Sequence, residues 1–162
     1  MPKSDPSQWR TSPPPEARIV PGLFRSRNYI WDNDHRIVES YGVTWSQFMA
    51  LASLRSAGPE RTLSPTQLYK VVQVTSGGMT KMLHALEHAQ LIERVENPAD
   101  GRSRLVVITP KGIALAEQII EKLVATNTAL IGGILEQSET EELARLLHKL
   151  SAGLQSRDAQ TE

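Results

Sequence analysis

Apolar residues recur at helical spacing near the middle of the chain, and two β-rich runs follow them. At 100° per residue, one stripe of the second helical segment is apolar, with Met79, Met82, Leu83 and Leu86. The runs Leu91–Val95 and Arg104–Ile108 are separated by Asn-Pro and Asp-Gly pairs, which are turn signals. Helix, helix, strand, turn and strand in this order predict a winged helix-turn-helix over residues 63–109.

The two central helices have recognisable starts. Ser64 is a candidate N-cap, Pro65 suits the first helical position, and Gln67 three residues after Ser64 completes a capping box. The first helix is therefore predicted from about residue 65 to residue 72. Thr75 can cap the second helix, which is predicted to run to about Ala89.

Helical spacing also predicts elements before this segment. One helix is expected over about residues 22–41, and a capping box of Thr44 and Gln47 opens another. Residues 61–63 are expected to add a short strand beside the wing.

Two further helices are predicted after the wing. Pro110 begins the first, and Gly132-Gly133 is expected to kink it. Ser138 and Glu141 form a capping box that opens the second. One face of this last helix is apolar, with Leu143, Leu146, Leu147, Leu150 and Leu154.

These elements predict a mainly α (α+β) fold in which long N- and C-terminal dimerisation helices flank the winged segment. Residues 1–18 hold five prolines and lack periodicity, which favours a flexible arm. Residues 19–162 are predicted to form one winged-helix domain, with a winged lobe at about residues 61–112. The helices at about 22–41 and 110–155 are longer than this lobe requires. Their excess apolar surface predicts a homodimer, and a monomeric helical bundle is the alternative.

The composition excludes several protein classes. The chain has 162 residues and no cysteine, which excludes a disulfide scaffold, a thiolate zinc site and a cysteine redox sensor. No apolar run approaches the roughly 20 residues that span a bilayer, and the N-terminus lacks a signal-peptide core, so a cytoplasmic protein without a membrane partner is expected. The net charge is zero, yet residues 61–112 carry 7 basic and 4 acidic residues. Local positive charge of this kind suits a nucleic-acid partner.

Four blocks of sequence in the winged segment also carry a family resemblance. They are Leu63-Ser-Pro-Thr-Gln-Leu68, Thr75-Ser-Gly-Gly-Met-Thr-Lys81, Leu86-Glu87 with Leu91-Ile92, and Asp100-x-Arg102-x-x-x-Val106-x-Ile108-Thr109-x-x-Gly112. Over about residues 23–154 the chain resembles the MarR-like (multiple-antibiotic-resistance regulator) winged-helix repressors of prokaryotes. The resemblance implies a homodimer that binds an inverted-repeat operator in double-stranded DNA. It also implies release by a small effector, often an aromatic anion such as a carboxylate.

The second helix of the motif is the predicted recognition helix. Small residues in its first turn, where helix propensity favours other types, let backbone N–H groups approach phosphates or base edges closely. Lys81 is expected to contact a phosphate, and Ser76 and Thr80 a base edge or a phosphate. The alternatives are a flexible loop before the helix and a solvated polar face. The predicted contacts in this helix are Thr75, Ser76, Gly77, Gly78, Thr80, Lys81 and, at the periphery, His84.

The wing supplies a second set of predicted contacts. Asp100 and Gly101 are expected to shape the turn, Asp100 by capping it or by pairing with Arg104. Arg102 would then project from the tip into the adjacent minor groove, where narrow A·T tracts concentrate negative potential. Arg104 contacts DNA or serves a structural role.

The resemblance places the effector between the winged lobe and the dimerisation helices. Five residues would line the wall of that cleft, and aromatic side chains at such spacing are also common in plain cores. They are Trp31, His35, Trp45, Phe48 and Met49.

No constellation for catalysis or for a cofactor is present. His84 and His88 have a spacing that can bind zinc, but two ligands do not make a site, so no metal is expected. Paired carboxylates, a nucleophile with its base and a phosphate-binding loop are all lacking, so the chain is not expected to be an enzyme. The remaining alternative is a winged helix that binds another protein and does not read DNA.

Overall fold

The structure is a computed structural model that describes residues 13–158 except residues 73 and 99, and only the backbone of residues 101, 102 and 158. This part of the chain forms six helices and three strands. The helices are α1 (Pro15–Ser40), α2 (Trp45–Arg55), α3 (Pro65–Val72), α4 (Ser76–His88), α5 (Pro110–Gly132) and α6 (Gln137–Asp158), and the strands are β1 (Thr62–Leu63), β2 (Ile92–Asn97) and β3 (Asp100–Ile108). None of the described helices is both long and apolar enough to cross a membrane.

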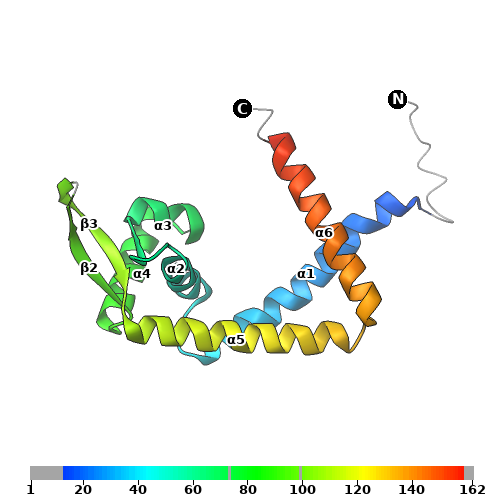
Figure 1. The fold of residues 1–162 in the computed structure, drawn as a ribbon, viewed down its shortest axis with the longest axis horizontal. Coiled ribbons are helices and arrows are strands. Elements are labelled where there is room, and N and C mark those ends of the chain that lie inside the picture. The colour runs from blue at the N-terminus through cyan, green and yellow to red at the C-terminus, as the bar shows by residue number, and fades with distance from the viewer. Residues whose placement is uncertain (1–12, 73, 99, 159–162) are drawn as a thin grey trace. The chain divides into compact units, whose positions relative to one another are not determined.

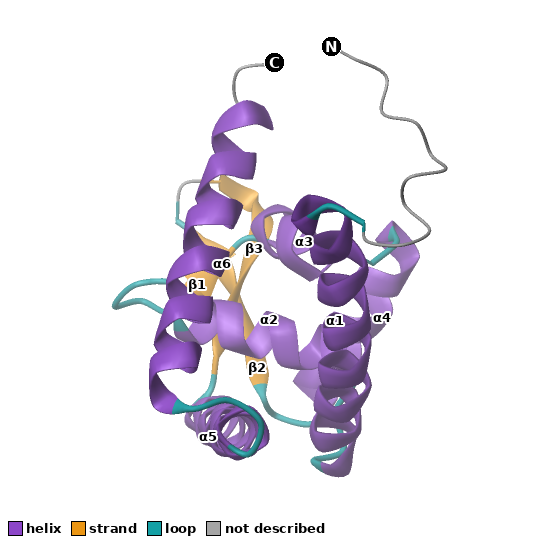
Figure 2. Ribbon diagram, turned by 90° about the vertical axis from the view of Figure 1, so that its right-hand side faces the viewer, coloured by secondary structure: helices purple, strands orange, loops and turns teal. Residues whose placement is uncertain are grey.

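The chain divides at Ile120 into two compact units. The first unit contains the winged helix-turn-helix, as predicted. Its antiparallel sheet has the strand order β1-β3-β2, and the predicted short strand is confirmed as β1, which pairs with β3 (Figure 2). Helix α4 contacts β2, and α2 contacts α3, α4 and β3, so the three short helices pack beside the sheet (Figure 1).

The core of the first unit is built from the predicted apolar stripes. Met79, Met82, Leu83 and Leu86 are buried on one side of α4. Val106 and Ile108 of β3 are also buried, whereas Arg104 on the same strand face lies beyond the core and is exposed. Burial of alternate residues fixes the register of β3, because a slip by one residue would turn the apolar set to solvent.

Three helix starts predicted from capping residues are confirmed. The Gln67 backbone N–H donates to Ser64 Oγ at 3.2 Å, and the Ser64 N–H donates to Gln67 Oε1 at 2.8 Å. Thr44 and Gln47 form the same reciprocal pair at the start of α2. Thr75 caps α4 through the Gly78 N–H at 3.2 Å. Each pair satisfies N–H groups that the first turn of a helix leaves without a partner.

The predicted start of the first helix is wrong. α1 begins at Pro15, before the expected start near residue 22, so residues 15–18 are helical and do not belong to the arm. The arm prediction rests on the five prolines and the lack of periodicity, but Pro15 occupies the first helical position, where the missing N–H would have had no partner. Pro21 lies inside the helix. The rest of the predicted arm, residues 1–12, lies outside the described residues.

The predicted kink at Gly132-Gly133 is also wrong, because α5 ends there. The N–H groups of Ile134 and Leu135 both donate to the Ile131 carbonyl at 2.9 Å, which closes the last turn. Helix α6 starts again only at residue 137.

The capping box predicted from Ser138 and Glu141 does not open α6. The Glu136 N–H donates to Glu139 Oε2 at 2.9 Å, and the helix begins at Gln137. Glu136 and Glu139 have the same spacing as Ser138 and Glu141 but lie two residues earlier, so a helix that starts with them is longer. Ser138 is therefore inside the first turn.

The second unit consists of the end of α5 and all of α6. The five leucines of α6 follow one another at helical spacing, and each is 40–54% exposed. They are therefore an apolar face that the described part of one chain leaves largely open to solvent. The predicted division into a winged lobe and dimerisation helices concerns an assembly and stays a prediction.

Candidate nucleic-acid interface

The polar side of α4 is exposed, as a recognition surface requires. Thr80, Lys81 and His84 are exposed along it, opposite the buried stripe. Ser76 and Gly77 are exposed in the first turn, where Thr75 acts as the cap. All the residues predicted for this surface are therefore accessible except Gly78, which is half-buried.

Gly77 and Gly78 differ in what surrounds them. A Cβ atom built on Gly78 would lie 3.1 Å from Thr75 Oγ1 and 3.5 Å from Val74 Cβ, so the cap itself favours glycine there. A Cβ atom on Gly77 would meet no atom within 4 Å. Packing within the described chain therefore gives no reason for glycine at position 77.

The C-terminal end of α4 is closed by a Schellman motif with an unusual residue. The Gln90 N–H donates to the Glu87 carbonyl, and the Leu91 N–H donates to the Leu86 carbonyl, both at 2.9 Å. Gln90 has a φ of 60°, in the left-handed region that favours glycine. This strained position could not be predicted, because glutamine is not a typical residue for the left-handed region.

Helix α5 holds this end of α4 in place. Thr109 Oγ1 donates to the Gln90 carbonyl at 2.8 Å, and Lys111 Nζ donates to the Ala89 carbonyl at 2.9 Å. A Cβ atom on Gly112 would lie 2.1 Å from the Leu91 carbonyl oxygen, so the two segments touch through their backbones. The orientation of α4 is therefore tied to the start of α5.

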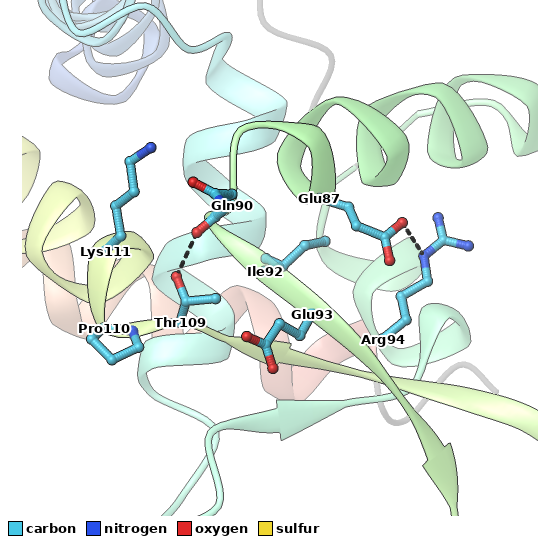
Figure 3. A pocket seen from close by; sticks show the side chains of 8 residues that line it. All are labelled: Glu87, Gln90, Ile92, Glu93, Arg94, Thr109, Pro110 and Lys111. Carbon is cyan, nitrogen blue, oxygen red and sulfur yellow. Dashed lines mark hydrogen bonds and ion pairs between the residues drawn. The ribbon is translucent and has the colours of Figure 1, made fainter.

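An open pocket of about 640 Å³ lies at this junction, lined by residues of α4, β2 and α5 (Figure 3). Its charged side chains are mixed in sign. Arg94 Nε lies 3.5 Å from Glu87 Oε2, and Lys111 already donates to the end of α4. This balance of charge gives the pocket no clear preference for an anion.

Four of the positive charges of the winged segment fall into two groups. Arg94 and Lys111 have partners within the fold. Lys81 and Arg104 are exposed on α4 and on β3. Arg104 faces Glu96 across the hairpin. The exposed pair is available to an anionic partner, and screening by salt would weaken that attraction.

The tip of the hairpin contains an irregularity in strand register. Glu96 pairs with Arg104, but the next residue, Asn97, pairs with Asp100, so residues 101–103 of β3 fall between two successive pairs. The side-chain amide of Asn97 donates to Ser103 Oγ at 2.9 Å, and Ser103 Oγ donates to the Asp100 carbonyl at 3.1 Å. Sequence reasoning missed Ser103, because its role depends on the register.

Two of the predicted wing residues lie in this irregular stretch. Gly101 and Arg102 belong to β3, and the structure describes only their backbone. The predicted capping or pairing by Asp100 and the groove contact of Arg102 stay predictions.

Four of the five predicted effector residues form one aromatic cluster in the first unit. The His35 ring stacks on Trp45 with centroids 4.7 Å apart, Trp31 lies 4.3 Å from His35, and Phe48 meets Trp45 edge-on at 5.6 Å. Phe48 is buried, and Met49 is half-buried on the same helix.

The guanidinium of Arg27 lies 4.6 Å from the centre of the Trp31 ring, a cation–π contact that sequence reasoning also missed. It adds a positive charge to the aromatic cluster. In the described part of the chain, no three His, Asp or Glu side chains gather as a metal site requires.

Comparisons with known proteins agree with this geometry. The family model described as "MarR family" matches residues 43–103. The multiple antibiotic resistance protein MarR of Salmonella typhimurium is 43% identical over 104 residues, which cover 64% of this chain and 68% of that protein. A crystal structure of a cysteine-to-serine variant of MarR from Escherichia coli in complex with operator DNA is similar, with a TM-score of 0.60, 32% identity and coverage of 82% of this chain and 95% of the other. A structure described as the multiple antibiotic resistance repressor MarR has a TM-score of 0.69, 28% identity and coverage of 85% and 95%.

Proposed function

Since this chain belongs to the MarR family of DNA-binding transcriptional regulators, we propose that it is a repressor that binds an inverted-repeat operator as a homodimer. A small effector, of which an aromatic carboxylate is the favoured class, releases it from the operator. The observation that carries the proposal is the combination of an exposed, small-residue start of α4 with a hairpin tip on the same unit.

The surface of α4 supports contact with DNA. Ser76 and Gly77 are small and exposed at the start of the helix, and Lys81 is exposed further along it. Backbone N–H groups at a helix start bind phosphate oxygens, and small side chains allow close approach. Arg102 at the hairpin tip is the proposed minor-groove contact, and Arg104 is a proposed phosphate contact or support.

The apolar face of α6 supports the homodimer. Its five leucines are consecutive on one side of the helix and remain about half exposed. Monomeric soluble proteins rarely expose a contiguous apolar patch of this kind. In α1, Ile19, Val20 and Phe24 are also exposed. In a two-fold dimer the same faces of both copies cover one another, and the two recognition helices would reach successive major grooves roughly 34 Å apart.

The aromatic cluster supports a flat, anionic effector. Trp31 is partly exposed, so its ring offers a stacking surface, and Arg27 beside it offers a guanidinium for a carboxylate. A ligand bound there would change the spacing between the recognition helices of the two copies. Affinity for the operator would then fall, because both half-sites could no longer be reached together.

The DNA contacts can be tested with two charge removals and a matched control. Arg102→Ala and Lys81→Ala should each weaken binding to operator DNA and reduce the slope of log Kd against log salt, because each removes one cation from the interface. Lys122→Ala removes an exposed lysine of α5 and should leave both quantities unchanged. Fluorescence anisotropy with a duplex enriched from a random library by the wild-type protein measures them. A wild-type protein that enriches no duplex would instead favour the protein-interaction module.

The dimer and the effector each have a direct test. Leu147→Glu/Leu150→Glu should convert the dimer to monomers in multi-angle light scattering, since it places two charges in the apolar face of α6. A monomeric wild-type protein would overturn the dimer. In a thermal-shift screen, a true effector among aromatic acids should stabilise the protein and release the DNA, and Arg27→Ala should remove its effect.

A further inference from the structure

The hairpin tip is built differently from the rest of the sheet. Between the pairs Glu96–Arg104 and Asn97–Asp100, three consecutive residues of β3, residues 101–103, have no place in the regular ladder. Backbone groups in such a stretch need partners from side chains or solvent. The conformation of these three residues therefore depends on whatever holds the two ends of the stretch together.

Ser103 provides that connection. Its hydroxyl accepts the Asn97 amide at 2.9 Å and donates to the Asp100 carbonyl at 3.1 Å. Asn97 is the last residue of β2, Asp100 is the first of β3, and Ser103 is the last residue before regular pairing resumes. One half-buried hydroxyl thus joins both strands and both ends of the irregular stretch.

We propose that Ser103 is a positioning residue for DNA recognition, which fixes the irregular stretch so that Arg102 at its centre is held ready for the groove. The inference rests on the proposed function, because it concerns the same DNA-binding surface. Ser103 acts through Arg102 and needs no contact with DNA of its own. Fixing the stretch before binding reduces the conformational entropy that would otherwise be lost when the wing meets DNA.

The hydrogen bonds of Ser103 are expected to affect DNA affinity strongly and folding stability modestly. Ser103 lies at the end of the hairpin, away from the buried part of β3. A hydrogen bond of this kind changes an equilibrium constant by about two- to twelvefold. With one wing on each copy of a dimer, Ser103→Ala should weaken binding by about four- to 150-fold. Its melting temperature should fall by roughly 1–6 °C, because the same hydrogen bonds also contribute to folding.

A double-mutant cycle tests this role against a merely structural one. Wild type, Ser103→Ala, Arg102→Ala and the double variant are compared by anisotropy on the duplex that the wild-type protein enriches from random sequence. If Ser103 acts through Arg102, Ser103→Ala should weaken binding only while Arg102 is present. Ser103→Thr, which keeps the hydroxyl, should restore wild-type affinity. The salt slope should fall in Ser103→Ala in the same direction as in Arg102→Ala.

The outcomes separate this inference from the function on which it rests. If the wild type enriches no duplex, the proposed function fails and the inference fails with it. If the wild type binds and Arg102→Ala weakens binding, but Ser103→Ala binds as the wild type does, the inference alone is wrong. An equal loss from Ser103→Ala with and without Arg102 would also overturn it, because the serine would then contact DNA directly or act elsewhere.

Discussion

Replacing Gly77 by alanine should make the protein more stable and a weaker DNA binder. Gly77 lies in the first turn of α4, is exposed, and would place an added Cβ atom more than 4 Å from every neighbouring side chain and loop. It is not among the glycines of positive φ. The folded chain therefore tolerates a methyl group at this position without strain.

The two effects can be estimated separately. Glycine in a helix costs about 0.5–1 kcal/mol relative to alanine, so Gly77→Ala should stabilise the protein by about that amount and raise Tm by roughly 1–4 °C. A DNA backbone that approaches the Cα atom closely would be displaced by the methyl group. A loss of about 1 kcal/mol in each of two half-sites weakens binding about thirtyfold.

The assay combines a thermal melt with DNA anisotropy on one protein preparation. Gly153→Ala is the matched control, because Gly153 is a helical glycine of α6 and also has open space around it. The control should gain a similar amount of stability and bind DNA as the wild type does. A Gly77→Ala protein that is more stable and binds with wild-type affinity would refute the close approach of DNA at this residue.

Three further substitutions test how the helices are held. Gly112→Ala should destabilise the protein by about 2–3 kcal/mol or more, since its Cβ would lie 2.1 Å from the Leu91 carbonyl oxygen. A Tm within about 2 °C of the wild type corresponds to roughly 1 kcal/mol or less and would contradict the backbone contact. Gln90→Gly should raise the free energy of unfolding by about 0.5–1 kcal/mol in urea denaturation, because it relieves a left-handed conformation, and a loss of stability would show that the glutamine side chain matters more. The hydrogen bond from Arg145 lowers the pKa of Glu142, so any stability from this pair is present above the unfolded pKa and is lost as pH falls. Both side chains are exposed, so screening by water leaves this contribution close to zero, and Glu142→Gln should leave Tm unchanged at neutral pH. A difference in Tm between the two proteins that grows as pH rises through the ordinary range of a glutamate pKa would contradict this.

The parts of the fold that sequence predicts well are those determined within four residues of chain. The reciprocal hydrogen bonds of Ser64 with Gln67 and of Thr44 with Gln47 join residues three apart, so the sequence contains both partners and their spacing. The buried stripe of α4 follows in the same way from helical periodicity. The polar face opposite it was therefore also predictable.

Helix boundaries were missed where two local solutions compete. Glu136 with Glu139 and Ser138 with Glu141 both offer a cap and an acceptor three residues apart, and the structure uses the first pair. Which pair opens α6 depends on the position and direction of the chain after the turn that follows the end of α5 at Gly132. Such a turn is a property of several residues together, and a cap signal alone does not decide between the two starts.

In the wing, the register of the hairpin tip is determined by residues of the core and not by local sequence. β3 is the central strand, paired with β1 through Val106 and with β2 through both Val106 and Ile108, and these two side chains are buried. Its base cannot slip without exposing them, and the turn closes at Asn97 and Asp100. β3 has three more residues than β2 in this part of the hairpin, residues 101–103, and they therefore lie at the tip without regular strand pairing. Sequence identifies Arg102 as a tip residue, but the course of the backbone through residues 101–103 depends on the register of the buried base of the strand and on the hydrogen bonds of Ser103.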